Sequence, residues 1–463
     1  MTMQKLFGTD GIRAKVGTYP LTEDMVCNIG KALGIYTSRL NSHKRKRQKI
    51  SIIKDTRDSG SFLEDVLSKG ILSTGVDVAK LDIMPSASLA YLVKEKRYDL
   101  GVVISASHND VTDNGLKLFS HRGYKLFHKE EAEIEKILFQ EVIPNTSIPP
   151  VQSESTPEQA LGKAEEKDEK KSYVDFLKNT VSGCDISKYK VVIDCAFGVA
   201  SLVAPEIFKE STKEVVSLND KPDGANINKE CGALHPDVVS KAVVENGADC
   251  GFSFDGDADR VIACDEKGKV LDGDFQLAII GNYLRKKELL KKNSIVGTQM
   301  SNLGLQMCVE QWGGKLIKTE VGDKLVLEKM LSSKLNLGGE QSGHIIPLDY
   351  TTTGDGILIA LLIMKIMAEE DKPLSKLGRC MYKFPQILVN INVPEKKPIN
   401  ELPKLSKIIA KNEEKLGISG RIYVRYSGTE GNKLRIMIEG QDQLQINEMA
   451  EAIAKTAKEE LGA

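Results

Sequence analysis

The sequence predicts an α/β protein of several domains that ends in a smaller α+β domain. Three observations support this fold class. The chain has 463 residues, which is too long for one ordinary core, so about three or four domains are expected. Short β-branched runs alternate with helical patterns through most of the chain, which favours sheets of mainly parallel strands covered on both faces. The C-terminal part changes to a different order of strands and helices.

The first elements fit this interpretation. A helix is expected over residues 21–40, where Thr22 offers an N-cap and apolar residues recur at helical spacing. A buried strand is expected at residues 50–53, with similar strands at 191–194 and 295–297. Ligands bind at the carboxyl ends of strands in such sheets, so the polar turns after these strands are candidate site loops.

Two stretches mark domain boundaries. Residues 148–171 are rich in Ser, Glu and Lys, and they lead into a helix expected over residues 173–180. The second boundary lies near Asp371-Lys372-Pro373. The elements expected after it are a strand over 387–393, a helix over 402–416, a strand pair over 421–438 and a helix over 446–461.

Composition excludes several classes of function. Lys and Arg number 64 against 65 for Asp and Glu, so the net charge of −1 gives no steering toward nucleic acid or an anionic membrane. The basic run at residues 43–49 has no aromatic residues between its charges to stack bases, and it is interpreted as a solvated loop. We therefore expect neither nucleic acid nor a membrane as a partner.

Location is predicted from the same composition. The longest apolar stretch, residues 356–364, falls short of the roughly 20 residues of a membrane span. The N-terminus lacks the apolar segment of a signal peptide. Eight cysteines are scattered without a Cys-x-x-Cys pair, which is typical of reduced thiols rather than of zinc or disulfide scaffolds. A soluble, cytoplasmic protein is expected.

The strongest motif places three carboxylates, Asp255, Asp257 and Asp259, at alternate positions of one turn. Such a turn suits a hard divalent cation, and without one the charges would repel each other. The spacing also resembles the start of an EF-hand, with Glu266 at its twelfth position. The glycine required at the sixth position is Arg260, however, and both flanks are typical of strands. A metal-binding turn between two strands is favoured over an EF-hand or a solvated turn.

A second motif presents a serine at the end of a buried strand, in Ser105-Ala106-Ser107-His108-Asn109. No Gly-x-Ser-x-Gly elbow is present, which counts against a serine hydrolase. A phosphoserine that faces a metal needs no adjacent base, because phosphoryl transfer depends on positioning and charge neutralisation. Taken alone, this segment favours an ordinary turn after a strand.

Three further loops carry polar groups. Residues 338–344 offer a turn suited to sugar hydroxyls, and residues 7–13 form a Gly-rich turn that ends in Arg13. The segment 425–430 combines a guanidinium, two hydroxyls and a glycine that exposes backbone N–H groups, which suits a phosphate dianion. Each of these loops, taken alone, is also typical of an exposed turn.

Taken in their order along the chain, the five loops resemble those of the phosphohexomutases, the phosphoglucomutase/phosphomannomutase family. The resemblance extends over nearly the whole chain. The stretches 222–228, 297–302, 321–324 and 351–356 agree with the resemblance. It implies four domains around a central cleft: three doubly wound α/β domains with mixed sheets and a smaller C-terminal α+β domain. The expected bounds are 1–165 with the serine loop, 166–256 with the metal loop, 257–373 with the sugar loop and 374–463 with the phosphate loop.

The resemblance also implies roles for particular residues. Ser107 is expected to be a phosphoserine, and Asp255, Asp257 and Asp259 hold one Mg²⁺ together with an oxygen on Ser107. Lys117 is the expected general acid/base, with Arg13 and His108 beside it. Its pKa would have to fall from about 10.4 to about 7–8, which Arg13 and the metal favour and the phosphate opposes. The expected substrate ligands are Arg260, Glu340, Ser342, His344, Arg425, Ser427, Gly428 and Thr429.

By the same resemblance, a hexose 6-phosphate becomes a 1-phosphate through a bisphosphate that turns end for end. A hexosamine phosphate is favoured as the substrate, with glucosamine 1,6-bisphosphate as the intermediate. This choice rests on Ser105-Ala106 and Gln341, and Glu340 could pair with a 2-ammonium group. Mannose or glucose phosphates, a phosphatase and a non-catalytic sugar-phosphate binding protein remain alternatives. A monomer or homodimer is expected.

Four features depart from the family pattern. Asp110 stands where proline usually follows His-Asn, Tyr426 and Gly431 replace prolines around the phosphate loop, and one residue is inserted before Arg435. Loss of proline raises the entropy cost of ordering a turn. We therefore expect a more mobile phosphate clamp.

Overall fold

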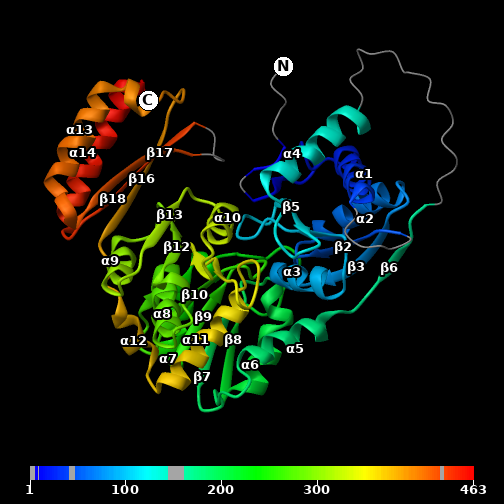
Figure 1. Cartoon of the computed structure of the whole chain (residues 1–463), viewed down its shortest axis with the longest axis horizontal. Helices are drawn as coiled ribbons and strands as arrows, with labels where there is room; N and C mark the ends of the chain where they lie inside the picture. The colour runs from blue at the N-terminus through cyan, green and yellow to red at the C-terminus, as the bar shows by residue number, and fades with distance from the viewer. Residues whose placement is uncertain (1–5, 9, 41–46, 144–160, 428–431, 463) are drawn as a thin grey trace.

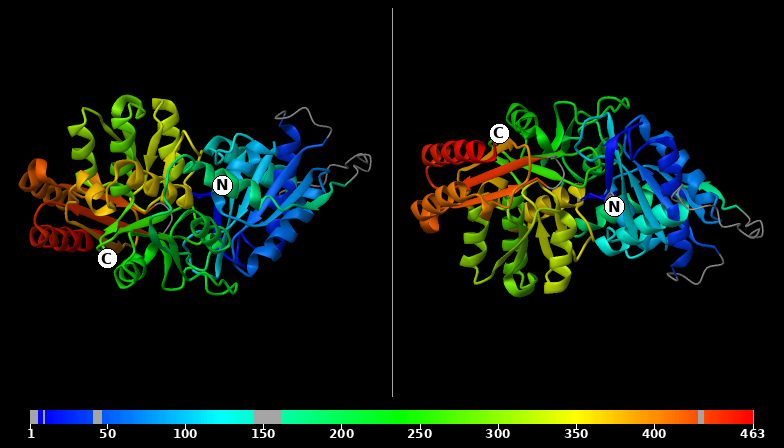
Figure 2. Two further views of the ribbon diagram at one scale, coloured as in Figure 1. Left: turned by 90° about the horizontal axis from the view of Figure 1, so that it is seen from below. Right: turned by 90° about the horizontal axis from the view of Figure 1, so that it is seen from above.

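The computed structural model describes residues 6–8, 10–40, 47–143, 161–427 and 432–462. Within these ranges the chain forms four sheets, each built from its own part of the sequence. The first and the fourth domain lie at the two ends, and the second and third lie side by side between them (Figures 1 and 2). Three α/β domains and a smaller C-terminal domain confirm the predicted fold class. No helix in the described ranges is long and apolar enough to cross a membrane.

The first domain has a six-stranded sheet in the order β1-β5-β4-β2-β3-β6. The strands are β1 (Ile12–Lys15), β2 (Lys49–Lys54), β3 (Asp77–Ile83), β4 (Leu100–Ile104), β5 (Asp113–Ser120) and β6 (Ala164–Glu166). The helices are α1 (Glu23–Arg39), α2 (Ser59–Leu72), α3 (Ser86–Glu95) and α4 (His128–Ile137). Strands β1 and β5 run antiparallel to their neighbours, so the sheet is mixed. Thr22 occupies the predicted N-cap of α1, but its side chain makes no capping hydrogen bond.

The two faces of this sheet belong to different hydrophobic clusters. Ile52 and Val102 pack on one face, whereas Ile53 and Val103 pack on the other, in a cluster that continues into the second and third domains. Strands that are buried on both faces explain the apolar run at 102–104 and the largely apolar run at 50–53, in which Ser51 is buried as well. Their polar successors therefore emerge at one edge of the sheet.

The second domain has the sheet order β11-β10-β9-β7-β8. Its strands are β7 (Lys190–Asp194), β8 (Glu214–Leu218), β9 (Cys250–Phe254), β10 (Val261–Asp265) and β11 (Val270–Leu271), and its helices are α5 (Lys170–Thr180), α6 (Ala204–Ser211) and α7 (Pro236–Asn246). Strand β10 pairs antiparallel with β9. The sheet therefore continues past residue 256, where the sequence suggested a boundary, because β9 and β10 are the two arms of one hairpin.

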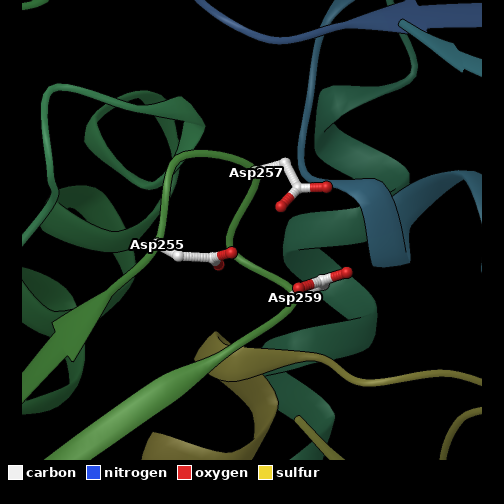
Figure 3. A group of neighbouring side chains, drawn as sticks. All are labelled: Asp255, Asp257 and Asp259. Atoms are coloured by element: carbon white, nitrogen blue, oxygen red, sulfur yellow. The ribbon is translucent and has the colours of Figure 1, made fainter. Parts of the chain in front are cut away.

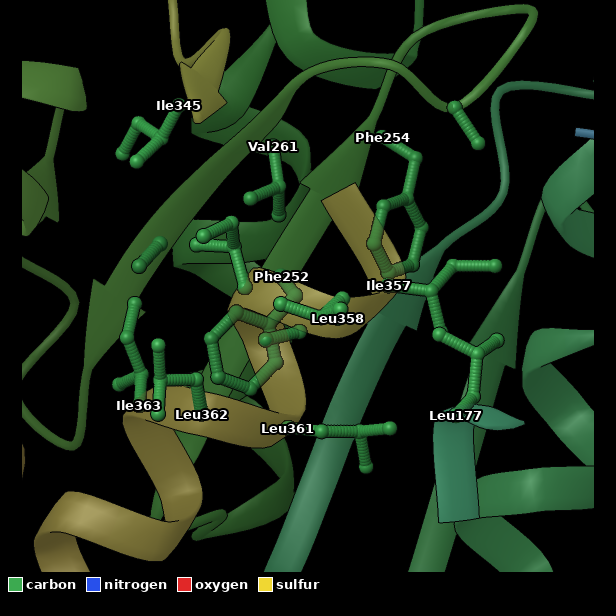
Figure 4. Close-up of a cluster of buried hydrophobic side chains, with 14 of the residues drawn as sticks. Leu177, Phe252, Phe254, Val261, Ile345, Ile357, Leu358, Leu361, Leu362 and Ile363 are labelled. Carbon is green, nitrogen blue, oxygen red and sulfur yellow. The ribbon is translucent and has the colours of Figure 1, made fainter. Parts of the chain in front are cut away.

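The third domain has the sheet order β13-β12-β14-β15. Its strands are β12 (Ile295–Thr298), β13 (Leu316–Thr319), β14 (Leu337–Gly339) and β15 (Ile345–Pro347), and its helices are α8 (Gly273–Lys286), α9 (Leu303–Gln311), α10 (Asp323–Ser333), α11 (Gly356–Glu370) and α12 (Leu374–Leu377). Helix α11 packs Ile357 and Leu358 with Phe252 and Phe254 of β9 in one buried cluster (Figure 4). This shared core fixes the β9–β10 hairpin between the two domains.

The C-terminal domain has an antiparallel sheet in the order β16-β18-β17. Its strands are β16 (Gln386–Asn392), β17 (Arg421–Tyr426) and β18 (Lys433–Glu439), and its helices are α13 (Pro403–Leu416) and α14 (Gln443–Leu461). All five predicted elements after residue 386 are therefore present. The sheet and both helices pack in a hydrophobic cluster of their own. A separate core is what a domain needs in order to move as a unit.

Candidate active site

The three aspartates of the metal motif lie in the turn between β9 and β10, as predicted (Figure 3). All three are buried, and one oxygen of each lies within 4.8 Å of the others. Both flanks are strands, which agrees with the prediction against an EF-hand. The turn depends on Ala258, which adopts a left-handed φ of 57°. The hairpin therefore gathers three carboxylates at one point.

The electrostatics of this cluster fit a hard divalent cation. Asp257 Oδ1 is buried and accepts no hydrogen bond from the described residues, and Asp259 Oδ1 has only longer contacts, 3.5 Å to His344 Nδ1 and 3.8 Å to Arg260 Nε. Burial raises the pKa of Asp255 to about 8, with further contributions from the charges of Asp259 and Asp257. Buried, unpaired carboxylate oxygens are costly, and oxygen ligands of this kind are those that Mg²⁺ and Ca²⁺ prefer. The three aspartates are therefore suited to a metal site.

Ser107 joins this cluster from the first domain. It follows β4, is buried, and donates a hydrogen bond from Oγ to Asp255 Oδ2 at 2.5 Å. Its φ is 55°, in the left-handed region that non-glycine residues rarely adopt. Backbone strain of this kind is characteristic of functional sites held in place by their surroundings. The predicted serine and metal loops thus meet across 148 residues of sequence.

Lys117 lies on β5 with its ammonium group among the carboxylates. Nζ is 2.6 Å from Asp257 Oδ2, 3.1 Å from Asp259 Oδ2 and 3.4 Å from Asp10 Oδ2. Burial lowers the pKa of Lys117, but the charges of Asp10, Asp257 and Asp259 outweigh it and raise the pKa well above its usual value. The expected fall in pKa is therefore absent from this state of the site. A cation on Asp257 and Asp259 would weaken two of the three contacts that raise it, and the contact with Asp10 would remain.

Arg13 and His108 flank the serine. Arg13 Nη2 is 2.6 Å from Asp10 Oδ2, and its Nη1 donates to Asn109 Oδ1 at 3.3 Å. His108 Nδ1 lies 3.3 Å from Ser107 Oγ and 3.1 Å from Arg260 Nη1. Burial, together with the charges of Arg260 and Arg13, lowers the pKa of His108 to about 3. The imidazole is therefore neutral, with Nδ1 free to accept from Arg260.

The sugar-loop residues occupy different environments. Glu340 is buried and accepts from the Gly322 N–H at 3.1 Å, whereas Ser342 is exposed. Burial raises the pKa of Glu340, against the opposing charge of Arg260. His344 is buried behind Asp259, with Nδ1 at 3.5 Å from Asp259 Oδ1, and its Nε2 accepts from the Gly354 N–H at 3.0 Å. His344 thus supports the metal loop, and its contact with substrate stays a prediction.

The phosphate loop is described only in part. Gly428 and Thr429, and the Gly431 departure, lie outside the described residues. Arg425 on β17 lies directly opposite Arg435 on β18, and Arg425 Nε is buried without a hydrogen-bond partner among the described residues. Like charges directly opposite each other destabilise a strand pair, so this arrangement favours a bound anion. Tyr426, which replaces a proline, ties its strand to Lys397 by donating to its carbonyl at 2.6 Å.

Several site residues were not identified from the sequence. Lys125 Nζ lies 2.7 Å from Asp10 Oδ1 and 2.5 Å from Asp323 Oδ2, which joins the first domain to the third. The hydroxyl of Ser86 donates to Asp257 Oδ2. Asp323 falls in the stretch 321–324 that supported the family resemblance, but Lys125 and Ser86 carry no local signal because their partners are distant in sequence.

Asp110 closes a turn in the serine loop. Its Oδ1 accepts from both the N–H and the hydroxyl of Thr112, each at 3.0 Å, and its carbonyl accepts from the Asp113 N–H at 3.1 Å. The Thr112 N–H bond is the largest cause that lowers the pKa of Asp110. This side-chain turn replaces the rigidity that proline gives elsewhere in the family.

We expect Asp110→Ala to lower the free energy of unfolding by about 0.5–1 kcal/mol, because it removes both hydrogen bonds at an exposed site. Asp110→Pro should leave it equal to or above that of the parent, since proline restricts the unfolded chain. Urea unfolding of the two variants measures this difference. A proline variant as unstable as the alanine variant would contradict the interpretation.

The comparisons with known proteins identify the family. The family models "Phosphoglucomutase/phosphomannomutase, alpha/beta/alpha domain I", II and III match residues 4–143, 171–268 and 272–384. The C-terminal domain model of the same family matches residues 388–456. The chain belongs to the phosphoglucomutase/phosphomannomutase family. Its four domains therefore correspond, in order, to those of the family.

Individual relatives and solved structures are also similar to this chain. Proteins named phosphoglucosamine mutase from Citrifermentans bemidjiense and Geobacter metallireducens are each 46% identical over 462 residues, covering 99% of this chain and 99% and 100% of theirs. A solved family protein from Burkholderia thailandensis has a TM-score of 0.77 at 22% identity, covering 99% of this chain and 98% of its own. The N-acetylphosphoglucosamine mutase of Aspergillus fumigatus has a TM-score of 0.67 at 18% identity, covering 98% and 96%. The solved structures share the fold.

Proposed function

We propose that this protein is a phosphoglucosamine mutase, which interconverts glucosamine 6-phosphate and glucosamine 1-phosphate. The observation that carries the proposal is the hydrogen bond from Ser107 Oγ to Asp255 within a buried cluster of three aspartates. Relatives of that name, 43–46% identical over nearly the whole chain, support the choice of sugar. In this scheme Ser107 is the phosphoserine, and glucosamine 1,6-bisphosphate is the intermediate.

Asp255, Asp257 and Asp259 would hold one Mg²⁺, with an oxygen of the phosphate on Ser107. When bound, that ion neutralises the carboxylates and withdraws charge from phosphorus as the bond to Ser107 breaks. The unpartnered Asp257 Oδ1 and the raised pKa of Asp255 support this assignment, because a bound cation would stabilise both carboxylates in their charged form. Arg260, which lies beside His108, offers a further positive charge to the phosphoryl oxygens.

Lys117 is the proposed general acid/base. As the phosphorus–oxygen bond to Ser107 breaks and the bond to the sugar oxygen forms, Lys117 Nζ takes the proton of the sugar hydroxyl. The proton passes on to the Ser107 oxygen, which leaves phosphorus as a hydroxyl. In the return step the proton of the Ser107 hydroxyl passes through Lys117 to the sugar oxygen that leaves phosphorus. Arg13 lies near enough to oppose protonation of Lys117, while burial does the same. Both effects act in the required direction, and a cation on Asp257 and Asp259 would weaken two of the three carboxylate contacts that oppose them.

The remote phosphate of the substrate would bind to Arg425, Ser427, Gly428 and Thr429, with Glu340 and Ser342 on the sugar hydroxyls. The separate core of the C-terminal domain supports a domain that opens while the bisphosphate turns end for end. His344 would act mainly through Asp259.

Arg425→Met tests the anchor. We expect KM for glucosamine 6-phosphate to rise about 10- to 100-fold, because charge-assisted hydrogen bonds contribute about 1.5–3 kcal/mol. The ligand-free variant should be no less stable than the parent, since its repulsion with Arg435 is removed. Steady-state kinetics and thermal unfolding measure the two effects, and Tyr423→Phe on the same strand serves as the control. An unchanged KM would remove Arg425 from the phosphate site.

The substrate is tested by comparing kcat/KM for glucosamine 6-phosphate, mannose 6-phosphate and glucose 6-phosphate. A clear preference for either of the last two would contradict the proposed specificity. Release of inorganic phosphate would instead favour a phosphatase, and the absence of turnover would favour a binding protein. We also propose action in the cytoplasm, as a monomer or homodimer, with the product feeding UDP-N-acetylglucosamine and peptidoglycan precursor synthesis.

A further inference from the structure

The backbone of the serine loop is held by a buried arginine from the first domain. The side chain of Arg57, in the turn after β2, is 0% exposed. Its Nη2 donates to the carbonyls of Ser107 at 3.2 Å and Asn109 at 2.9 Å, and its Nη1 donates to the carbonyl of Asp110. One guanidinium therefore fixes three carbonyls around the serine.

The same two carbonyls are also held from the second domain. Asn228 Nδ2 donates to the carbonyls of Ser107 at 2.9 Å and Asn109 at 3.1 Å. The Asn228 backbone is itself anchored, because its N–H donates to the Ala196 carbonyl at 2.8 Å. The amide of Asn228 and the guanidinium of Arg57 thus form a clamp that spans two domains.

The metal loop closes the remaining side. A Cβ added to Gly256, between Asp255 and Asp257, would lie 2.7 Å from the Ser107 carbonyl and 2.9 Å from Asn228 Nδ2. Backbone of the metal loop therefore packs directly against the clamped carbonyl. The Ser107 carbonyl is therefore fixed relative to Asp255, the aspartate that accepts the hydrogen bond of the Ser107 hydroxyl.

A second chain of bonds fixes the N–H side of the serine. Ser107 N–H donates to Ser105 Oγ at 2.9 Å, and Ser105 Oγ donates to Asp55 Oδ2 at 2.6 Å. Asp55 Oδ2 in turn lies 3.0 Å from Arg57 Nε. Both peptide groups that flank Ser107 are therefore tied to Arg57, directly or through Asp55.

We propose that Arg57 and Asn228 are positioning residues for phosphoryl transfer: they hold Ser107 in its left-handed conformation, so that Oγ faces the metal loop. The proposal rests on the proposed role of Ser107. Without the clamp, Ser107 relaxes from its strained φ to a commoner region, and Oγ turns away from Asp255. A displacement of about 1 Å from the reactive position costs roughly 100-fold in rate.

Asn228→Ala is the decisive variant, because it removes one side chain of the clamp and leaves no buried charge unpaired. Its matched control is Asn226→Ala in the same loop, where the amide donates to the Lys221 carbonyl at 3.1 Å and the side-chain oxygen accepts from the Asp223 N–H at 3.0 Å. Both variants lose hydrogen bonds of that loop, but only Asn228→Ala releases the serine. Because Asn228 has a left-handed φ of 60°, Asn228→Gly is assayed beside it as the variant without backbone strain, and it should lose kcat to the same extent.

We expect Asn228→Ala to lower kcat for glucosamine 6-phosphate about 10- to 100-fold, with KM within about threefold of the parent. The rate at which glucosamine 1,6-bisphosphate phosphorylates Ser107 should fall by the same factor. Intact-protein mass spectrometry over time measures this rate. Asn228→Asp should be slower still, since a carboxylate faces two carbonyl oxygens. Asn226→Ala should retain parental kcat and phosphorylation rate.

Equal kcat values for Asn228→Ala and Asn226→Ala would overturn the clamp. So would a loss of kcat that merely follows a lowered thermal midpoint, because that is the effect of a structural residue. Ser107→Ala, assayed alongside, distinguishes failure of the proposed function from failure of the clamp. An active Ser107→Ala enzyme would reject the proposed function, whereas an inactive one beside a fully active Asn228→Ala would reject only the clamp.

Discussion

Ser107→Ala is expected to lower kcat for glucosamine 6-phosphate by about four orders of magnitude or more. The substitution removes the oxygen that bonds to phosphorus, and positioning by neighbouring groups cannot replace it. The fold should persist, because Ser107 gives up one hydrogen bond to Asp255, whose raised pKa allows it to remain protonated. The free energy of unfolding should change by only about 1–3 kcal/mol.

Two measurements check this prediction together. The rate comes from coupled assay of glucosamine 1-phosphate formation, and folding comes from thermal unfolding with and without Mg²⁺. The variant should keep a rise in melting temperature with Mg²⁺, since the three aspartates remain. A kcat within tenfold of the parent, in a protein that still binds Mg²⁺, would exclude Ser107 as the carrier of the phosphoryl group.

Asp255→Asn is expected to have the second largest effect, on metal binding and rate together. The amide keeps the size of the side chain but removes one charged ligand, so kcat should fall about 100- to 1,000-fold and the Mg²⁺-dependent rise in melting temperature should be lost. The metal-free variant should be as stable as the metal-free parent at low pH, because asparagine resembles the protonated carboxyl that burial favours there.

The pH dependence of the metal-free parent gives the sign of this effect. Asp255 has a pKa of about 8 when folded, against 3.8 as its ordinary value. Between these values the folded state binds more protons than the unfolded state, so the free energy of unfolding falls as pH rises. The free energy of unfolding of Asp255→Asn should not fall in this way, because asparagine does not titrate. Toward pH 8 the metal-free variant should therefore be more stable than the metal-free parent. Parallel stability curves for the two metal-free proteins would show that Asp255 does not titrate in this way.

The sequence was informative where local pattern and chemistry coincide. The metal turn was predicted from three carboxylates at alternate positions, Asp255 to Asp259, between two segments typical of strands. The serine turn was predicted because Ser107 follows a strand whose apolar run favours burial on both faces. That these two turns meet depends on how two sheets pack, which no local pattern contains. The family resemblance, not the spacing, supplied that contact.

Other features depend on tertiary contacts and could not be derived in advance. The direction of the Lys117 pKa depends on which carboxylates its ammonium reaches, and Asp10, Asp257 and Asp259 reverse the expected fall. Arg57 lies in a turn that the sequence marked as a candidate site loop and Asn228 in a stretch that supported the family resemblance, but neither residue was given a role. The second sheet continues past residue 256 because strand β10 pairs with β9, and pairing is decided by the hairpin rather than by composition.

The central claim is that Ser107 carries the phosphoryl group, and phosphopeptide mass spectrometry of the active enzyme tests it most directly. The protein would be incubated with glucosamine 1,6-bisphosphate, digested, and compared with a sample then treated with excess glucosamine 6-phosphate. The account predicts phosphate on the peptide at Ser107 and its loss to the sugar in the second sample. Phosphate on another residue, or an active enzyme in which Ser107 is never phosphorylated, would contradict it.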